Sequence, residues 1–166
     1  MNVAFQMDDL SKINFTTDST IALILESQSR DNKNYVYSPD DLFIKNNEVF
    51  TSACLVIFNN KDFSKYKCAK KKIINLSNMN FIFIRQDPPF DMNYITSTYL
   101  LEFLSSSTII VNNPTSVRNF SEKIFPLRFK EYMAPTIISQ DVEVIKKFLI
   151  KHEDIITKPL YGNGGE

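Results

Sequence analysis

Hydrophobic residues in this chain occur as short runs and as sets at helical spacing, and the two kinds alternate along the sequence. The densest run, residues 81–84, has four consecutive large apolar side chains, which is typical of a strand buried on both faces of a parallel sheet. Further strands are predicted at residues 2–7, 35–37 and 108–111. Helices are predicted to begin after Asp18 and after Asp91, where a carboxylate can cap the first turn. This alternation predicts an α/β layer fold.

The pattern changes between residues 43 and 75, where it predicts an antiparallel insertion. The strands and turns of this insertion are predicted at residues 43–45, 46–47, 49–58 and 59–62. Residues 65–72 are rich in lysine and are predicted to form an exposed strand edge, because lysines discourage edge-to-edge pairing. A phosphate-binding patch is the alternative, although charge runs are usually solvated faces. The expected sheet is doubly wound and mostly parallel, with this antiparallel insertion.

A second unit is predicted to begin near residue 121. Its predicted elements are a short helix at 121–125, a strand at 135–138, a helix after Asp141 and a strand at 155–160. Pro126 is expected to bend or end the first of these helices, because proline lacks an amide hydrogen. We therefore divide the chain into an N-terminal domain at 1–120 and a second unit at 121–166.

The glycines of this chain, Gly162, Gly164 and Gly165, are all close to its end and follow the predicted strand that carries Lys158. A strand that delivers a lysine and then a glycine-rich loop can hold nucleotide phosphates. Backbone N–H groups approach the oxygens there, and the ammonium neutralises charge. A flexible tail is the alternative interpretation of the same glycines.

A charged loop, Arg85-Gln86-Asp87, follows the central run and precedes Pro88-Pro89. In open α/β sheets the carboxyl edge of the strands is where ligands bind. The two prolines restrict the backbone, so Arg85 and Asp87 are expected to be held in place before a ligand arrives. The alternative is a rigid turn whose charges face only solvent.

Composition narrows the classes of partner. Apolar residues make up 43% of the chain, which indicates a folded globular protein, and 19 basic residues balance 19 acidic ones. Without a basic field, nucleic acid and acidic membrane surfaces are not expected partners. The first residues resemble no targeting signal, and no apolar run approaches membrane-spanning length, so a cytoplasmic protein is expected.

The two cysteines, Cys54 and Cys68, form no Cys-x-x-Cys pair and have no histidine cluster nearby. We therefore expect two reduced structural thiols and neither a disulfide nor a zinc site. His152 is the single histidine, which excludes a multi-histidine metal site. It is expected to have a structural or surface role on the apolar side of a helix.

Several short motifs occur together along nearly the whole chain. They are Met7-Asp8, Asp18-Ser19, Arg85-Gln86-Asp87-Pro88-Pro89-Phe90-Asp91, Val111-Asn112-Asn113-Pro114, Glu122-Lys123 and Thr157-Lys158-Pro159-Leu160-Tyr161-Gly162-Asn163-Gly164-Gly165. In this order and approximate spacing the chain resembles bacterial glutathione synthetase. The resemblance is weakest from about residue 43 to residue 80. The Asp-Pro-Pro-Phe-Asp motif is fairly specific, whereas the last motif is shared more widely among ATP-grasp ligases.

The resemblance implies a pre-ATP-grasp domain followed by the start of an ATP-grasp domain. Enzymes of this family join γ-glutamylcysteine to glycine with ATP and Mg²⁺, through an acyl phosphate on the dipeptide. The resemblance implies that Lys123, Lys158, Gly162, Gly164 and Gly165 contact ATP, and that Asp18, Ser19 and Arg85 face the dipeptide. The magnesium ligands are expected in a part of the family's sequence that is absent here, so we expect a ligase fragment that is inactive alone.

Two other functions remain open at this stage. A non-catalytic binding or oligomerisation module is the first alternative, because residues up to about 120 could form a complete layer fold. The sequence leaves open whether the chain forms homo-oligomers. An unrelated flavodoxin-like nucleotide binder is the second. Its first loop would need glycines for close approach to phosphate, and this chain has none there.

Overall fold

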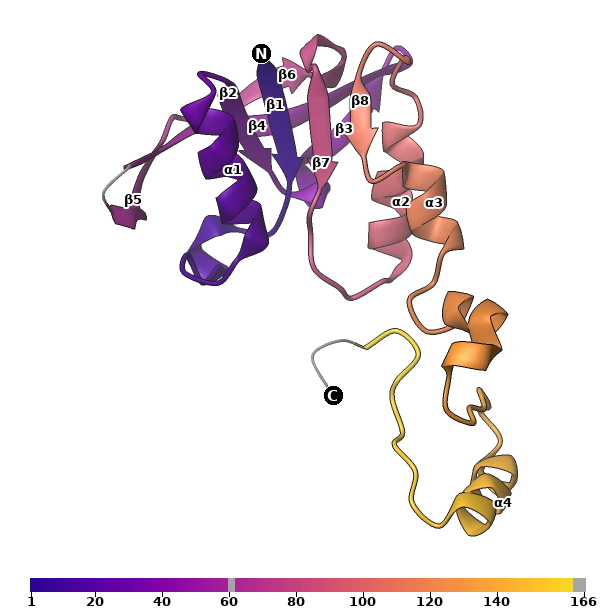
Figure 1. Cartoon of the computed structure of the whole chain (residues 1–166). Helices are drawn as coiled ribbons and strands as arrows, with labels where there is room; N and C mark the ends of the chain where they lie inside the picture. The colour runs from indigo at the N-terminus through magenta and orange to yellow at the C-terminus, as the bar shows by residue number, and fades with distance from the viewer. Residues whose placement is uncertain (60–61, 163–166) are drawn as a thin grey trace. The chain divides into compact units, whose positions relative to one another are not determined.

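The computed structural model describes residues 1–59 and 62–162 (Figure 1). The chain divides into two compact units, Met1–Asn119 and Phe120–Glu166. Each unit is described by itself below. No helix in the described part of the chain is long and apolar enough to cross a membrane.

The first unit is built on a sheet with strand order β3-β4-β2-β1-β7-β8. Its parallel strands are β1 (Asn2–Gln6), β2 (Lys33–Tyr37), β7 (Phe81–Ile84) and β8 (Ile109–Val111). The antiparallel strands are β3 (Leu42–Lys45), β4 (Glu48–Asn59), β5 (Asp62–Cys68) and β6 (Lys72–Asn75). The long strand β4 pairs with β2, β3, β5 and β6, so it carries the whole antiparallel insertion.

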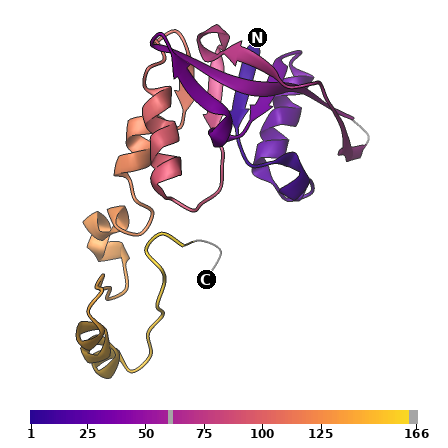
Figure 2. The same cartoon turned by 180° about the vertical axis from the view of Figure 1, so that it is seen from behind.

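Helices cover both faces of this sheet (Figure 1 and Figure 2). They are α1 (Ser19–Ser29), α2 (Met92–Leu101) and α3 (Pro114–Asn119), with short 3₁₀ helices at Leu10–Lys12, Pro39–Asp41 and Leu76–Asn78. Asp18 caps α1 by accepting hydrogen bonds from the backbone N–H groups of Thr20 and Ile21. Asp91 caps α2 in the same way through Tyr94. Local capping thus fixes where both helices begin.

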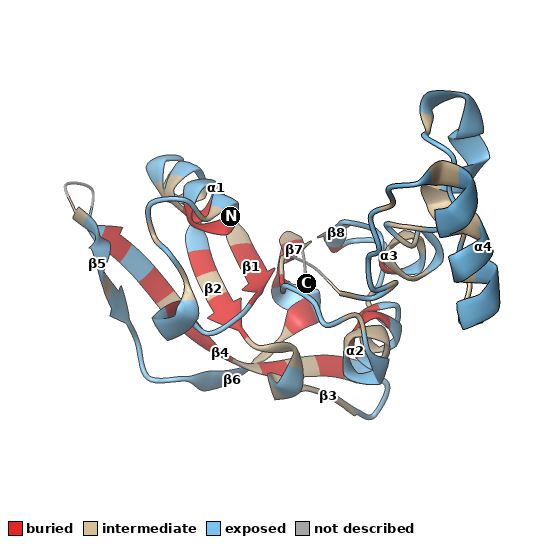
Figure 3. Cartoon of the chain, turned by 90° about the horizontal axis from the view of Figure 1, so that it is seen from below, coloured by how far each residue is buried: buried red, intermediate tan, exposed pale blue. Residues whose placement is uncertain are grey.

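Two apolar cores lie on opposite faces of the sheet because successive side chains of a strand point to opposite sides. Phe5 of β1 packs in one core with Ile21 and Ile24 of α1. Its neighbour Ala4 belongs to the other core, which includes Leu101 of α2. Burial runs along β1, β2 and β4 in Figure 3. The predicted doubly wound α/β fold with an antiparallel insertion is therefore confirmed.

The lysine-rich segment is divided between two strands. Residues up to 68 belong to β5, residues 69–71 form a connection, and β6 begins at Lys72. The prediction of an exposed strand edge is right for β5, whose residues are mostly exposed. Strand β6 was not predicted, because its short run gives little signal without β4 as its known partner. Part of the turn predicted at 59–62 lies outside the described residues.

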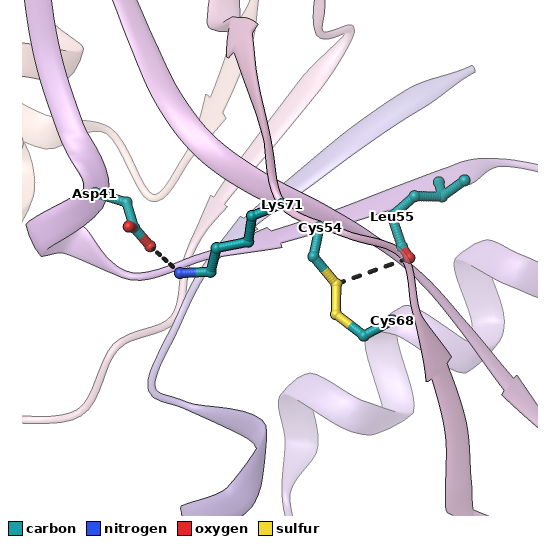
Figure 4. Close-up of a disulfide and its surroundings, with 5 residues drawn as sticks. All are labelled: Asp41, Cys54, Leu55, Cys68 and Lys71. Carbon is teal, nitrogen blue, oxygen red and sulfur yellow. Dashed lines mark hydrogen bonds and ion pairs between the residues drawn. A yellow bond between two sulfur atoms is a disulfide. The ribbon is translucent and has the colours of Figure 1, made fainter.

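A disulfide joins Cys54 in β4 to Cys68 at the end of β5 (Figure 4). The expectation of two reduced thiols is therefore wrong. The two cysteines are 14 residues apart in sequence, and antiparallel pairing, in which Val56 lies opposite Cys68, brings their Cα atoms to 5.8 Å. That separation suits a disulfide. Strand register produced this proximity, and the cysteine spacing in the sequence did not reveal it.

The second unit contains a 3₁₀ helix at Phe125–Tyr132, kinked at Phe129, and the helix α4 (Val142–His152). Asp141 caps α4 as predicted. His152 ends the helix against the ring of Phe148, which agrees with the predicted structural role. The predicted helix at 121–125 is wrong, because Pro126 lies in the first turn of the 3₁₀ helix, a position that needs no amide hydrogen.

Two further predictions for the second unit are also wrong. Residues 135–138 and 155–160 are not strands in the described structure. A strand requires a neighbour that shares its backbone hydrogen bonds, and the described residues of this unit supply none to either segment. No residue in the described range 120–162 is buried. This unit therefore has helices and extended segments without a core of its own.

Candidate functional site

Two loops are tied together at the carboxyl edge of β1 and β7. The backbone N–H of Arg85 donates to the carbonyl oxygen of Gln6 at 2.7 Å, which extends the pairing of the two strands by one residue. The backbone N–H of Asp87 then donates to the carboxylate of Asp8 at 2.7 Å. The charged loop predicted from the sequence is therefore held at the sheet edge where α/β proteins bind ligands.

The side chain of Arg85 lies over the N-terminus of α1. Its Nε donates to Thr20 Oγ1 at 3.1 Å, and its Nη2 donates to Ser19 Oγ at 2.7 Å. A guanidinium has five N–H donors, so these two bonds leave others for a ligand. The helix N-terminus and the guanidinium are both positive, and together they favour an anion at this point.

Asp18 lies next to Ser19, which binds Arg85, and its carboxylate caps α1. Its Oδ1 accepts the backbone N–H groups of Thr20 at 2.7 Å and Ile21 at 3.0 Å. The sequence analysis predicted Asp18, Ser19 and Arg85 as one site, and the structure brings the three together. Thr20, which anchors the guanidinium from a buried position, was missed because a threonine at the start of a helix has no distinctive sequence signal.

A buried cluster of three polar side chains holds the loop that follows β7. Gln6, Gln86 and Ser97 come from β1, from the loop after β7 and from α2. Gln6 Nε2 donates to Ser97 Oγ at 3.2 Å and to Gln86 Oε1, and Gln86 Nε2 donates to Ser97 Oγ at 3.3 Å. Buried amides joined in this way resist displacement, because breaking one bond leaves a desolvated polar group unpaired.

Tyr94 in the first turn of α2 completes the surroundings of Arg85. Burial raises the pKa of its phenol, the positive charge of Arg85 lowers it, and the carboxylates of Asp87 and Asp8 raise it again. The raised pKa keeps the phenol neutral, so it can donate or accept a hydrogen bond at neutral pH. The site is thus a half-buried arginine with polar groups around it.

The second unit contains the residues that the sequence analysis assigned to a nucleotide. Lys123 Nζ donates to the carbonyl oxygen of Gly162 at 2.5 Å and lies 3.7 Å from a carboxylate oxygen of Glu122. Lys158 is exposed, and no hydrogen bond or ion pair joins it to another residue that the structure describes. The structure therefore brings Lys123 and Gly162 together and leaves Lys158 apart. Gly164 and Gly165 lie outside the described residues.

The described residues contain no group of three or more His, Cys, Asp or Glu side chains that could hold a metal ion. The acidic residues near Arg85 do not form such a group. Asp18 caps α1 through one oxygen, and Asp8 accepts a backbone hydrogen bond.

Comparison with known proteins assigns this architecture to a class. Residues 1–118 match the family "Prokaryotic glutathione synthetase, N-terminal domain", and residues 122–166 match "Prokaryotic glutathione synthetase, ATP-grasp domain". The chain is thus an α/β protein of the ATP-grasp class, with an N-terminal domain ahead of the start of the ATP-grasp domain. The chain belongs to the prokaryotic glutathione synthetase family.

Individual relatives agree along the whole chain. It is 40% identical over 165 residues to a glutathione synthetase of Rhodopseudomonas palustris, covering 99% of this chain and 53% of that protein. It is 43% identical over 164 residues to that of Agrobacterium fabrum, covering 99% of this chain and 51% of that protein. A glutathione synthetase of Buchnera aphidicola is 34% identical over 167 residues, with 99% and 52% covered. The chain spans about half the length of the curated relatives it matches.

Proposed function

We propose that this chain is the N-terminal part of a glutathione synthetase, which joins γ-glutamylcysteine to glycine at the expense of ATP. The observation that carries the proposal is the match to two consecutive domains of one family, over residues 1–118 and 122–166. In this proposal residues 1–120 form the pre-ATP-grasp domain and residues 121–166 begin the ATP-grasp domain. ATP use favours a cytoplasmic location.

We propose that the first unit holds the dipeptide. γ-Glutamylcysteine carries carboxylates, and Arg85 presents a guanidinium that Ser19 and Thr20 already orient. Arginine recognises a carboxylate through paired N–H donors in a fixed plane. The loop needs little rearrangement on binding, because Gln6 and Asp8 hold its backbone before a ligand arrives. Asp18 contributes by fixing the start of α1, and Ser19 by orienting Arg85.

We propose that the second unit supplies part of the nucleotide site. Lys123 and Lys158 would neutralise phosphate charge, and Gly162, Gly164 and Gly165 would let backbone N–H groups approach the oxygens. The Lys123 bond to the Gly162 carbonyl is one that a phosphate oxygen would replace. Magnesium would bind to carboxylates in the half of the relatives that this chain does not match, and would neutralise charge during phosphoryl transfer.

The proposed reaction has two steps. The free carboxylate of the dipeptide attacks the γ-phosphorus of ATP, which forms an acyl phosphate and releases ADP. The amine of glycine then attacks the acyl carbon, and phosphate leaves as the amide bond forms. An acyl phosphate must be kept from water, so a closed site around it is required. We propose that this chain alone does not complete that site and does not catalyse the reaction.

Calorimetric titration with γ-glutamylcysteine tests the dipeptide site. We expect the chain to bind the dipeptide and Arg85→Met to weaken that affinity by about 10- to 100-fold, because a hydrogen bond to a charged group is lost. Arg30→Met is the matched control. Arg30 forms an exposed ion pair with Glu26 at the other end of α1, so its loss should leave the affinity unchanged. Equal losses in the two variants would contradict the assignment of Arg85.

A further inference from the structure

The two cysteines joined by the disulfide in Figure 4 differ in exposure. Cys54 is 1% exposed and packs in the core between α1 and the sheet. Cys68 is exposed at the end of β5. An incoming thiolate can therefore reach the sulfur of Cys68, whereas the core shields the sulfur of Cys54.

Lysines surround the exposed sulfur in sequence, at positions 65, 67, 70, 71 and 72. Lys65 pairs with Asp62 at 2.9 Å and Lys71 pairs with Asp41 at 2.7 Å. The other three make no ion pair with any residue that the structure describes. Lys67 and Lys72 lie opposite Ile57 and Ala53, on the other face of the sheet from Cys68, whereas Lys70 lies in the connection that follows Cys68. The segment around Cys68 thus carries an excess of positive charge, and such a field raises the local concentration of anions.

A cytosolic location would make the Cys54–Cys68 disulfide unusual. Disulfides in cytosolic proteins of mesophiles are usually transient or redox-sensing, because the glutathione pool keeps most thiols reduced. This step rests on the proposed function, since an ATP-dependent ligase would work in that compartment. Glutathione, the product of the proposed reaction, is itself an anionic thiol, and the lysines around Cys68 would attract it.

We propose that Cys54 and Cys68 form a thiol–disulfide exchange site for anionic low-molecular-mass thiols and their disulfides. A thiolate RS⁻ attacks the Sγ of Cys68, so an RS–Sγ bond forms, the Cys54–Cys68 bond breaks, and Cys54 leaves as a thiolate that takes up a proton. A second RS⁻ attacks the external sulfur, which releases Cys68 as a thiolate and RSSR. Two electrons pass from two thiols to the protein disulfide, and the reverse sequence oxidises the protein.

Reoxidation of the reduced chain tests the site. The reduced chain is mixed with glutathione disulfide, which is anionic, or with hydroxyethyl disulfide, which is neutral, and free thiols are followed by alkylation and intact mass. We expect Lys67→Ser combined with Lys70→Ser to slow oxidation by glutathione disulfide about 3- to 10-fold. The rate of oxidation by hydroxyethyl disulfide should not change. Added salt should reduce the difference. Lys33→Ser combined with Lys45→Ser, on other strands, is the matched control and should change neither rate.

Single-cysteine variants test which sulfur is attacked. With glutathione disulfide, we expect the Cys54→Ser variant to capture glutathione on Cys68. In the Cys68→Ser variant, we expect modification of the buried Cys54 to be at least about 10-fold slower. Peptide mapping of the unmutated chain gives the same information if a variant fails to fold. Equal modification of the two cysteines, equal rates in both lysine variants, or persistent free thiols in glutathione disulfide would overturn the proposal. The assay contains neither ATP nor dipeptide, so its outcome is separate from that of the calorimetry.

Discussion

Single side chains join the helices of the first unit as well as its strands. Glu102, at the end of α2, accepts hydrogen bonds from Thr115 and from Arg118 Nη2, the second at 2.6 Å, so it ties α2 to α3. The hydrogen bonds from Thr115 and Arg118 lower the pKa of Glu102 below its ordinary value. A carboxylate whose pKa is lowered by folding stabilises the fold above its unfolded pKa, and that stabilisation disappears as the pH falls through the folded value.

Glu102→Gln therefore has a pH-dependent effect on stability. At about pH 7 we expect it to lower the free energy of unfolding by about 1 kcal/mol, a value reduced from that of a buried charged bond because the Glu102 side chain is 34% exposed. This difference should shrink as the pH falls through the lowered folded pKa of Glu102, because the carboxylate then becomes protonated. Urea unfolding at a series of pH values from about pH 7 downward measures the difference. Glu26→Gln in an exposed pair is the control, and a pH-independent loss at Glu102 would contradict this account.

Some residue roles could be predicted from the sequence and others could not. The caps Asp18, Asp91 and Asp141 were predictable, because each bonds to a backbone group two or three residues ahead. The bonds of Gln6 to Gln86 and Ser97 join residues 80 and 91 positions apart, and no local pattern reveals such a pairing. The Cys54–Cys68 bond was missed for the same reason, since strand register creates it.

At the scale of elements, α2 is fixed to the sheet by a narrow buried stripe. Leu101 is 0% exposed and packs in the core with Ala4 and Ile82, whereas Phe103, just past the end of the helix, is 60% exposed. We expect Leu101→Ala to lower the free energy of unfolding by about 2–5 kcal/mol, because it removes buried methyl groups and leaves a cavity. Phe103→Ala should cost less than about 0.5 kcal/mol, although it removes more atoms. Denaturant unfolding of both variants measures the two losses in the free energy of unfolding. A larger loss at Phe103 would contradict the described packing.

Several elements of the first unit were predictable because each contains its own signal, whereas β6 was not. Strands β1 and β7 are apolar runs, and α1 and α2 combine helical spacing with a cap. The extended segments 135–138 and 155–160 have a strand-like composition, yet neither forms a strand in the described structure. Composition can predict that a segment is extended, but pairing depends on a neighbour that the segment itself does not encode.

The two units of the chain differ in the side chains that they bury. The first unit has two cores on the two faces of its sheet, and in the second no residue in the described range 120–162 is buried. Apolar side chains such as Ile150 and Ile156 are largely exposed there. The described part of this unit therefore lacks, by itself, the dry enclosure that the proposed acyl phosphate would require.

Tripeptide formation by the purified chain measures whether this chain alone can form the peptide bond. The chain is incubated with γ-glutamylcysteine, glycine, ATP and Mg²⁺, and glutathione and ADP are quantified against a reaction without protein. The full-length relative from Rhodopseudomonas palustris serves as the positive control. We predict no glutathione above the background from this chain, while the dipeptide still binds to it. Glutathione formed by the chain alone, at a rate near that of the full-length relative, would contradict the account.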